Sequence, residues 1–307
     1  MFKRLSIFAP AKLNLYLKVY ERQLDGYHRI ETVFQSIDLF DELNFQIQEI
    51  NGEGLITIRL NPGTQNDLVP TDKRNLIYRA AKAFLREAKI NHLNINVNLT
   101  KKIPVGGGLA GGSTDAAATL YALNYFLNEP LRQVDLLRLA RELGSDIPFC
   151  LLGGSMIGTG RGDHLTRLPV QQERIFVLIF PPPSLELKAK DIYEEFDLLS
   201  QKSRPPSRAV TLERFVELMM NHEERLDRYL YNSLEEAVIK MSYWVDRAKS
   251  AIDARGFASL VSGSGPSVFT SVQDMRAAQK LADEIEEEGF KTSIHRAIDN
   301  CFQVIVH

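Results

Sequence analysis

Alternation of apolar and polar positions is the clearest pattern along the chain. Residues 2–20 and, most regularly, residues 93–99 repeat with a period of two, which is typical of strands with one buried face. A short, fully apolar run at residues 175–180 predicts a strand buried on both faces. Further strands are predicted at residues 55–60, 268–272 and 302–306.

Helical periodicity separates these strands. The helix predicted at residues 75–89 places six apolar side chains on one face. Other helices are predicted at residues 114–127, 134–143, 191–199, 212–221, 234–254 and 275–288. This mixture predicts an α+β fold. The prolines at 181–183 mark a break, and we expect two domains, residues 1–172 and 173–307. The polar, proline-containing loop at residues 201–208 is expected to be exposed and mobile.

Composition and charge narrow the class of protein. The chain has 307 residues, 44% of them hydrophobic and 25% charged, which is typical of a soluble globular protein. The net charge of −2 gives no reason to expect nucleic acid or an anionic membrane as a partner. Cys150 and Cys301 lie far apart, so reduced thiols and a cytoplasmic location are expected. No signal peptide is recognisable, and no apolar run reaches about 18 residues, so no membrane span is expected.

The stretch from Val105 to Ala118 carries the strongest chemical signal. Five of the seven residues at 106–112 are glycine, and three good N-cap residues follow, Ser113, Thr114 and Asp115. A helix is therefore expected to begin near Ser113 or Thr114. A glycine-rich loop before an open helix N-terminus is an anion site, most often for phosphate. A simple turn would need only one or two glycines.

Two familiar phosphate loops do not fit this stretch. The Walker loop has a lysine before its Ser/Thr, and Gly112 stands there instead. Residues 106–111 do match G-x-G-x-x-G, but a dinucleotide fold needs a strand soon after the helix. Here Asn128-Glu129-Pro130 breaks the chain and another helix is predicted, so the Rossmann interpretation fails.

Positive charge for the phosphates must come from elsewhere in the chain. Lys12, Lys101 and Lys102 are the candidates, and Lys12 is the most unusual because it lies between Pro10 and an apolar alternation. Asp146 follows a predicted helix end at Gly144 and leads into an apolar run. It is either a functional carboxylate or a plain helix cap, and the sequence leaves both open.

These residues resemble those of the GHMP kinases, a family of small-molecule kinases. Residues 104–117 resemble the family's phosphate loop, and residues 262–267 resemble its third motif. Four other segments resemble the branch of the family that acts on a cytidine-diphosphate-linked methylerythritol. They are residues 9–15, 25–28, 35–39 and 143–149. The matching segments span nearly the whole chain and occur in the family's order.

The resemblance implies ATP-dependent, Mg²⁺-assisted phosphorylation of an alcohol. It also implies a two-domain GHMP-kinase fold, with an N-terminal ATP-binding α/β domain and a C-terminal ferredoxin-like domain. By position, Lys12 and Asp146 are the implied catalytic pair, and Asn75 is implied to lie near the adenine. The residues implied to bind the ATP phosphates are Pro104, Val105, Gly106, Gly107, Gly108, Leu109, Ala110, Gly111, Gly112, Ser113 and Thr114. The residues implied to hold the cytidine diphosphate head of a small-molecule substrate are Asn14, Tyr27, His28, Phe34 and Tyr193.

No protein ligand for Mg²⁺ is identified, although Ser113 or Thr114 is possible by analogy with other phosphate loops. The segment at residues 199–228 looks longer than the family needs.

Another GHMP kinase, acting on homoserine or mevalonate, should lack the Asp25–His28 context. A non-catalytic nucleotide-binding protein should have lost Lys12 or Asp146. The sequence does not give the oligomeric state.

Overall fold

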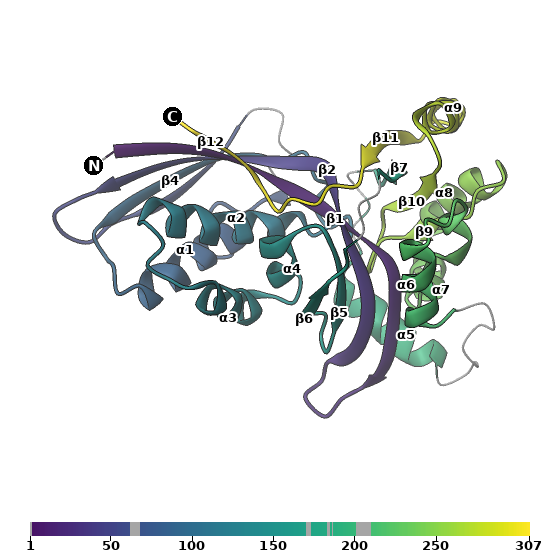
Figure 1. Ribbon diagram of the computed structural model, residues 1–307, viewed down its shortest axis with the longest axis horizontal. Coiled ribbons are helices and arrows are strands. Elements are labelled where there is room, and N and C mark those ends of the chain that lie inside the picture. Colours follow the sequence, from purple (N-terminus) through teal and green to yellow (C-terminus); the bar gives the residue numbers. More distant parts are fainter. Residues whose placement is uncertain (1, 62–67, 170–172, 183–184, 186, 201–209) are drawn as a thin grey trace.

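Two long antiparallel strands, β1 (Phe2–Arg22) and β2 (His28–Glu49), form the centre of the fold (Figure 1). The computed structural model describes residues 2–61, 68–169, 173–182, 185, 187–200 and 210–307. The other strands are β3 (Ile56–Leu60), β4 (Leu93–Thr100), β5 (Ser155–Thr159), β6 (His164–Arg167), β7 (Ile175–Phe180), β8 (Tyr231–Asn232), β9 (Leu260–Val261), β10 (Val268–Val272), β11 (Lys291–Arg296) and β12 (Gln303–Val306). The helices are α1 (Leu76–Glu87), α2 (Gly111–Phe126), α3 (Gln133–Leu143), α4 (Ile147–Leu152), α5 (Ala189–Ser200), α6 (Leu212–Met220), α7 (Glu235–Met241), α8 (Tyr243–Asp253) and α9 (Met275–Glu286), with a 3₁₀ helix at Leu226–Tyr229.

The first sheet has the strand order β12-β1-β2-β4-β3, and α1, α2 and α3 lie on one of its faces (Figure 1). The alanine-rich start of α2 lets this helix approach the sheet closely, since Ala116, Ala117 and Ala118 are fully buried. The alternation predicted for residues 93–99 is realised in β4, whose apolar positions face the helices.

The second sheet has the order β11-β7-β10-β9, and β7 is buried along its whole length, as its apolar run predicts. Apolar residues of α7, α8 and α9 pack with β7 and β10 in one cluster. A separate cluster joins the two sheets, because Leu13 and Tyr16 of β1 pack together with Phe176 of β7 and Phe269 of β10. The two parts of the molecule therefore share a continuous core.

Several sequence predictions are confirmed and others are wrong. The α+β class is confirmed, and so are the strands at β1, β3, β4, β7, β10 and β12. The single helix predicted at residues 234–254 is two helices, because Ser242 is extended (φ −145°) and its side chain accepts a hydrogen bond from the Val245 N–H to begin α8. The loop predicted at residues 201–208 lies outside the described residues.

The last strand returns to the first sheet. β12 pairs antiparallel with β1, from Leu5 opposite Val306 to Phe8 opposite Gln303. The two chain ends consequently lie near each other in Figure 1. The predicted boundary between residues 172 and 173 stays a prediction, and residues 173–307 include this strand of the first sheet.

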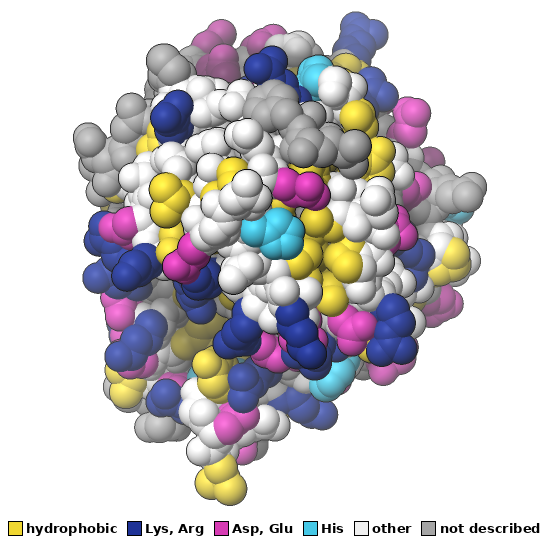
Figure 2. Space-filling model, turned by 90° about the vertical axis from the view of Figure 1, so that its left-hand side faces the viewer, with side chains coloured by type: hydrophobic (Ala, Val, Ile, Leu, Met, Phe, Trp, Pro, Cys, Tyr) yellow, Lys and Arg dark blue, Asp and Glu magenta, His cyan; other side chains and the backbone are white. Residues whose placement is uncertain are grey.

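Figure 2 shows one face of the molecule, on which basic and acidic side chains are interspersed, in keeping with the net charge of −2. Among the described residues, no helix combines the length and the apolar character that crossing a bilayer requires.

Candidate active site

The glycine-rich loop connects β4 to α2. Gly106 and Gly108 have positive φ angles of 70° and 76°, which glycine adopts without the steric penalty of other residues. Ala110 is also left-handed (φ 59°), so the helix begins at Gly111 rather than at Ser113 or Thr114 as the sequence predicted. Its N-cap residue makes no side-chain capping bond. The first turn of α2 therefore presents backbone N–H groups to the cavity, as a phosphate site requires.

The second glycine/serine segment packs directly against this loop. A Cβ built on Gly108 would lie 2.1 Å from the Ser262 carbonyl oxygen, so only glycine fits there. The Ser262 hydroxyl donates a hydrogen bond to the Gly108 carbonyl (3.0 Å), and the Ser267 N–H donates to the Gly107 carbonyl (3.2 Å). Residues 262–267 thus hold the loop from behind.

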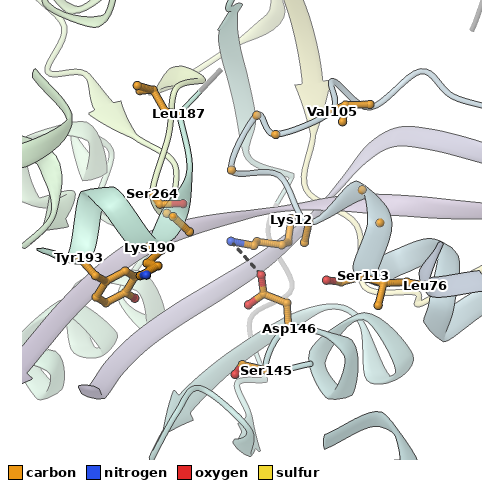
Figure 3. Close-up of a pocket in the computed structure, with 18 of the residues that line it drawn as sticks. Lys12, Leu76, Val105, Ser113, Ser145, Asp146, Leu187, Lys190, Tyr193 and Ser264 are labelled. Carbon is orange, nitrogen blue, oxygen red and sulfur yellow. Dashed lines mark ion pairs between the residues drawn. The ribbon is translucent and has the colours of Figure 1, made fainter. Parts of the chain in front are cut away.

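Lys12 and Asp146 face each other beside the loop (Figure 3). Their Nζ and Oδ2 atoms lie 3.7 Å apart. The Lys12 residue is only 4% exposed, whereas the Asp146 side chain is 36% exposed. Asp146 stands at the N-cap position of α4, but its side chain makes no capping hydrogen bond. The plain helix-cap alternative is therefore wrong, and the carboxylate is directed at Lys12 instead.

Asn14 and Phe34 surround the buried end of Lys12. The Lys12 ammonium donates to Asn14 Oδ1 at 2.5 Å. Phe34 is 1% exposed and stacks on Phe149, with ring centroids 4.7 Å apart. Lys12 Nζ lies 5.7 Å from the centroid of the Phe34 ring. Both residues border the cavity next to the Lys12–Asp146 pair, and their predicted contact with a cytidine head stays a prediction.

An aromatic group stands at the far end of the cavity. His28 Nε2 lies 2.8 Å from Asp197 Oδ1 of α5, and the His28 ring lies 5.0 Å from the ring of Tyr193. Burial raises the pKa of Tyr193 to about 12, and the negative charge of Asp146 adds to this shift. Tyr27 is 53% exposed, and the guanidinium carbon of Arg161 lies 3.8 Å from the centroid of its ring. The structure thus brings Tyr27, His28 and Tyr193 to one end of the cavity, and their contact with a cytidine head stays a prediction.

One cavity of about 780 Å³ joins the loop to this aromatic end. The size is within the usual range for small-molecule sites, about 300–1,000 Å³. Leu68–Pro70, Asn75 and the glycine loop line one end, while Arg22, Gly26–His28 and Tyr193 line the other. Lys12 and Asp146 lie between the two ends, with Lys190 and Tyr193 approaching from α5 (Figure 3).

Asn75 borders the loop end of the cavity, where the resemblance places the adenine. Its side chain caps α1, because Oδ1 accepts from the Ile77 N–H at 2.8 Å. Its Nδ2 donates to the Pro70 carbonyl at 2.6 Å. Asn75 therefore fixes the shape of this wall, and its contact with adenine stays a prediction.

Lys101, a candidate cation for the phosphates, has its ammonium in a buried ion cluster below the loop that the sequence did not predict. Lys101 pairs with Asp41 and, at 3.0 Å, with Asp115. Asp41 Oδ1 also accepts from the backbone N–H groups of Lys102 (2.7 Å) and Ile103 (2.9 Å). Burial raises the pKa of Asp115 to about 8, the Asp41 carboxylate adds to the shift, and Lys101 opposes it. Asp115 was predicted as an N-cap, and its carboxylate instead joins this cluster.

The candidates for a metal ligand differ in their access. Thr114 is fully buried, and its hydroxyl has no hydrogen-bond partner among the described residues. Ser113 borders the cavity (Figure 3). Within the described part of the chain, no group of three or more His, Cys, Asp or Glu side chains could hold a metal ion. Ser113 is therefore the better placed of the two residues that the sequence suggested.

Comparison with known proteins agrees with this geometry. The family model "GHMP kinases N terminal domain" matches residues 75–154, and "GHMP kinases C terminal" matches residues 210–291. The chain is 36% identical to the 4-diphosphocytidyl-2-C-methyl-D-erythritol kinase of Clostridium botulinum, over 96% of this chain and 100% of that protein. A similar enzyme from Nostoc sp. is 34% identical over 97% of this chain and 98% of its own length.

Solved structures of kinases also resemble this chain. A crystal structure of 4-(cytidine 5'-diphospho)-2C-methyl-D-erythritol kinase superposes with a TM-score of 0.75 and 28% identity, covering 95% of this chain and 98% of the other. Homoserine kinase from Cytophaga hutchinsonii shares the fold at a TM-score of 0.72 but is 21% identical, covering 98% and 97% of the two chains. The chain therefore belongs to the GHMP kinases and, within them, to the 4-diphosphocytidyl-2-C-methyl-D-erythritol kinase family.

Proposed function

We propose that this protein transfers the γ-phosphate of ATP to the 2-hydroxyl of 4-diphosphocytidyl-2-C-methyl-D-erythritol, in the non-mevalonate route to isoprenoid precursors. One observation carries the proposal. A lysine–carboxylate pair lies between a phosphate loop and an aromatic group, inside one continuous cavity. This arrangement matches a donor nucleotide at one end, an aromatic base at the other and an alcohol between them.

The loop end suits ATP. Backbone N–H groups of Gly111, Gly112 and Ser113 begin α2, and the positive end of the helix dipole favours phosphate oxygens there. Gly106 and Gly108 have positive φ angles and no side chain, so nothing on them would hold the phosphates away from the loop. Leu68, Pro70 and Asn75 would border the adenine.

The Lys12–Asp146 pair suits the transfer itself. Asp146 accepts the proton of the acceptor hydroxyl as that oxygen bonds to the γ-phosphorus, and the bond to the ADP oxygen breaks. Lys12 stabilises the negative charge that spreads over the phosphoryl oxygens, because its ammonium is buried and held in place. The 3.7 Å separation lets one carboxylate oxygen face Lys12 while the exposed part of the group meets the alcohol.

Mg²⁺ is the expected companion of ATP. The Ser113 side chain borders the cavity and fits an ion that keeps most of its ligands as water and phosphate. When bound, the ion would neutralise charge on the β- and γ-phosphates.

The aromatic end suits a pyrimidine. Tyr27 and Tyr193 can stack on the ring, since aromatic stacking on a base contributes about 1–3 kcal/mol. His28 offers hydrogen bonds to the edge of the base, and its contact with Asp197 fixes the ring orientation. We place the enzyme in the cytoplasm with small molecules alone as its substrates, as the composition favours.

The test is a phosphate-transfer assay with ATP, Mg²⁺ and four acceptors. We expect rapid turnover of 4-diphosphocytidyl-2-C-methyl-D-erythritol and no turnover of homoserine, mevalonate or galactose. Equal turnover of mevalonate or homoserine would overturn the proposed acceptor, while leaving kinase chemistry in place.

A further inference from the structure

A buried threonine lies behind the catalytic pair. Thr32 of β2 is fully buried and does not line the cavity described above. Its hydroxyl stands 2.8 Å from Asn14 Nδ2, and Asn14 Oδ1 in turn accepts from the Lys12 ammonium. We infer that Thr32 is a positioning residue for Lys12, acting through the Asn14 amide; this inference rests on the proposed role of Lys12.

The direction of each hydrogen bond in this chain is fixed. Thr32 Oγ1 lies 2.7 Å from the Tyr16 carbonyl oxygen, which can only accept, so the Thr32 hydroxyl donates there. Its lone pair is then available to accept from Asn14 Nδ2. This leaves Asn14 Oδ1 facing Lys12, and the lysine ammonium has only donors to offer. The carbonyl of Tyr16 thus determines, through one hydroxyl, which end of the Asn14 amide meets Lys12.

The strands supply this geometry. Asn14 stands opposite Phe34 in the β1–β2 ladder, and Thr32 is two residues from Phe34 on the same strand. Residues two apart on a strand share a face, so Asn14 and Thr32 meet on one side of the sheet. A register shift between Asn14 and Tyr16 lies at this point of the ladder.

Orientation matters here because Lys12 has a long, flexible side chain. A rotated Asn14 amide would direct N–H donors at the ammonium and push it away from the carboxylate of Asp146. Misplacing a catalytic group by about 1 Å can cost about 100-fold in rate. Thr32 prevents the rotation without touching substrate.

The main test removes the Thr32 hydroxyl and keeps the shape of the side chain. Thr32→Val should lower kcat by about 10-fold and leave the KM for ATP within about 2-fold of wild type, because the loop is untouched. Thr32→Ser restores the hydroxyl and should recover most of kcat. Thr270→Val is the matched control, since Thr270 is also fully buried and donates to the Ala258 carbonyl at 2.8 Å, outside the cavity. That control should lose stability without losing kcat.

A double-mutant cycle separates positioning from general damage. In an Asn14→Ala background the Thr32→Val change should reduce kcat no further, because the residue through which it acts is gone. A full additional 10-fold loss in that background would overturn the inference. Wild-type kcat in Thr32→Val would overturn it too. Should Thr32→Val not fold, Thr32→Ala compared with Thr32→Ser gives the same contrast between absent and present hydroxyl.

The outcomes also separate this inference from the proposed function. A wild-type protein that does not phosphorylate the cytidine substrate would refute the function itself. An active wild type with a fully active Thr32→Val variant would refute only the role of Thr32.

Discussion

The two ends of the cavity are built in opposite ways. The proposed phosphate-binding part of the loop end comes from one continuous stretch, residues 104–113, and its proposed binding groups are backbone N–H groups in a loop with positive φ angles. The aromatic end comes from three distant segments, Tyr27–His28, Arg161 and Tyr193, and its binding groups are side chains. A backbone site is therefore local and tolerant of side-chain change except at its glycines. A side-chain site depends on how remote elements pack.

A substitution of Asp146, which lies between the two ends, should have the largest effect on kcat. Asp146→Asn keeps the shape and removes the base, so we expect kcat to fall by about 10²–10⁴-fold with little change in ATP affinity. Thermal stability should stay near that of wild type, because the Asp146 side chain caps no helix. Steady-state kinetics and a melting curve check this together, and near-normal kcat would remove Asp146 from the mechanism.

At the loop end, the effect of replacing a glycine should depend on which atoms surround it. Gly108→Ala would place a Cβ 2.1 Å from the Ser262 carbonyl oxygen, so the loop must shift and move its N–H groups away from the phosphates. We expect the KM for ATP to rise about 10-fold, which corresponds to a loss of about 1.4 kcal/mol of binding free energy, while the KM of the acceptor stays unchanged. Gly106→Ala is the control, because its Cβ would meet nothing within 4 Å and only its φ angle is unfavourable. A larger effect at Gly106 would contradict this account.

A substitution at the aromatic end should change the KM of the acceptor and leave the KM for ATP unaltered. Arg161 lies over Tyr27 and pairs with Asp25 at 2.7 Å, and the pKa of Asp25 is lowered by hydrogen bonds from the Tyr27 N–H and from Arg161. Cation–π contacts at exposed sites contribute about 0.5–1 kcal/mol, so Arg161→Gln should raise the acceptor KM by about 2- to 5-fold. The KM for ATP should not change.

Arg138→Gln is the matched control for that experiment. Arg138 is an exposed arginine that pairs with Glu87 and Glu142 on the helical side of the molecule, away from the cavity. It should leave both KM values unaltered. If Arg161→Gln changes the KM for ATP, or leaves the KM of the acceptor unchanged, the assignment of ATP to one end and the acceptor to the other is contradicted.

The ion cluster below the loop should make the stability of the protein depend gradually on pH. The pKa of Asp115 is about 8 in the folded protein and 3.8 as its ordinary value, so folding takes up a proton between these pH values. The free energy of unfolding of wild type, relative to Asp115→Asn, should therefore fall as pH rises from about 4 to about 8, by at most about 1.4 kcal/mol per unit, and level off above. Denaturant unfolding of both proteins at several pH values measures this. A difference that grows with pH would show that Lys101 keeps Asp115 ionised.

The same contrast explains what the sequence could predict. The glycine loop and most strands follow from local patterns, because glycine and period-two alternation act over a few residues. The N-cap residues Ser113, Thr114 and Asp115 misplaced the start of α2, which begins at Gly111. The pairing of His28 with Asp197, the contact of Arg161 with Tyr27, and the Asp41–Lys101–Asp115 cluster each join residues far apart in the chain. Alternation along β1 gives no sign that Asn14 will meet Thr32. The break at Ser242 was missed because the apolar pattern continues through it.

The paired strands β1 and β2 have a consequence for substrate choice. Lys12 and Asn14 lie on β1, the Tyr27–His28 turn joins the two strands, and between these points β1 and β2 are paired with register shifts at Asn14/Tyr16 and Val19/Arg22. A hydrogen-bonded ladder is stiff compared with a loop. The β1–β2 hairpin therefore fixes the distance between the acceptor hydroxyl, beside Lys12, and the cytosine ring, beside Tyr27 and His28. An acceptor whose linker is one phosphate shorter or longer should bind through its base and still present its alcohol out of reach of Asp146.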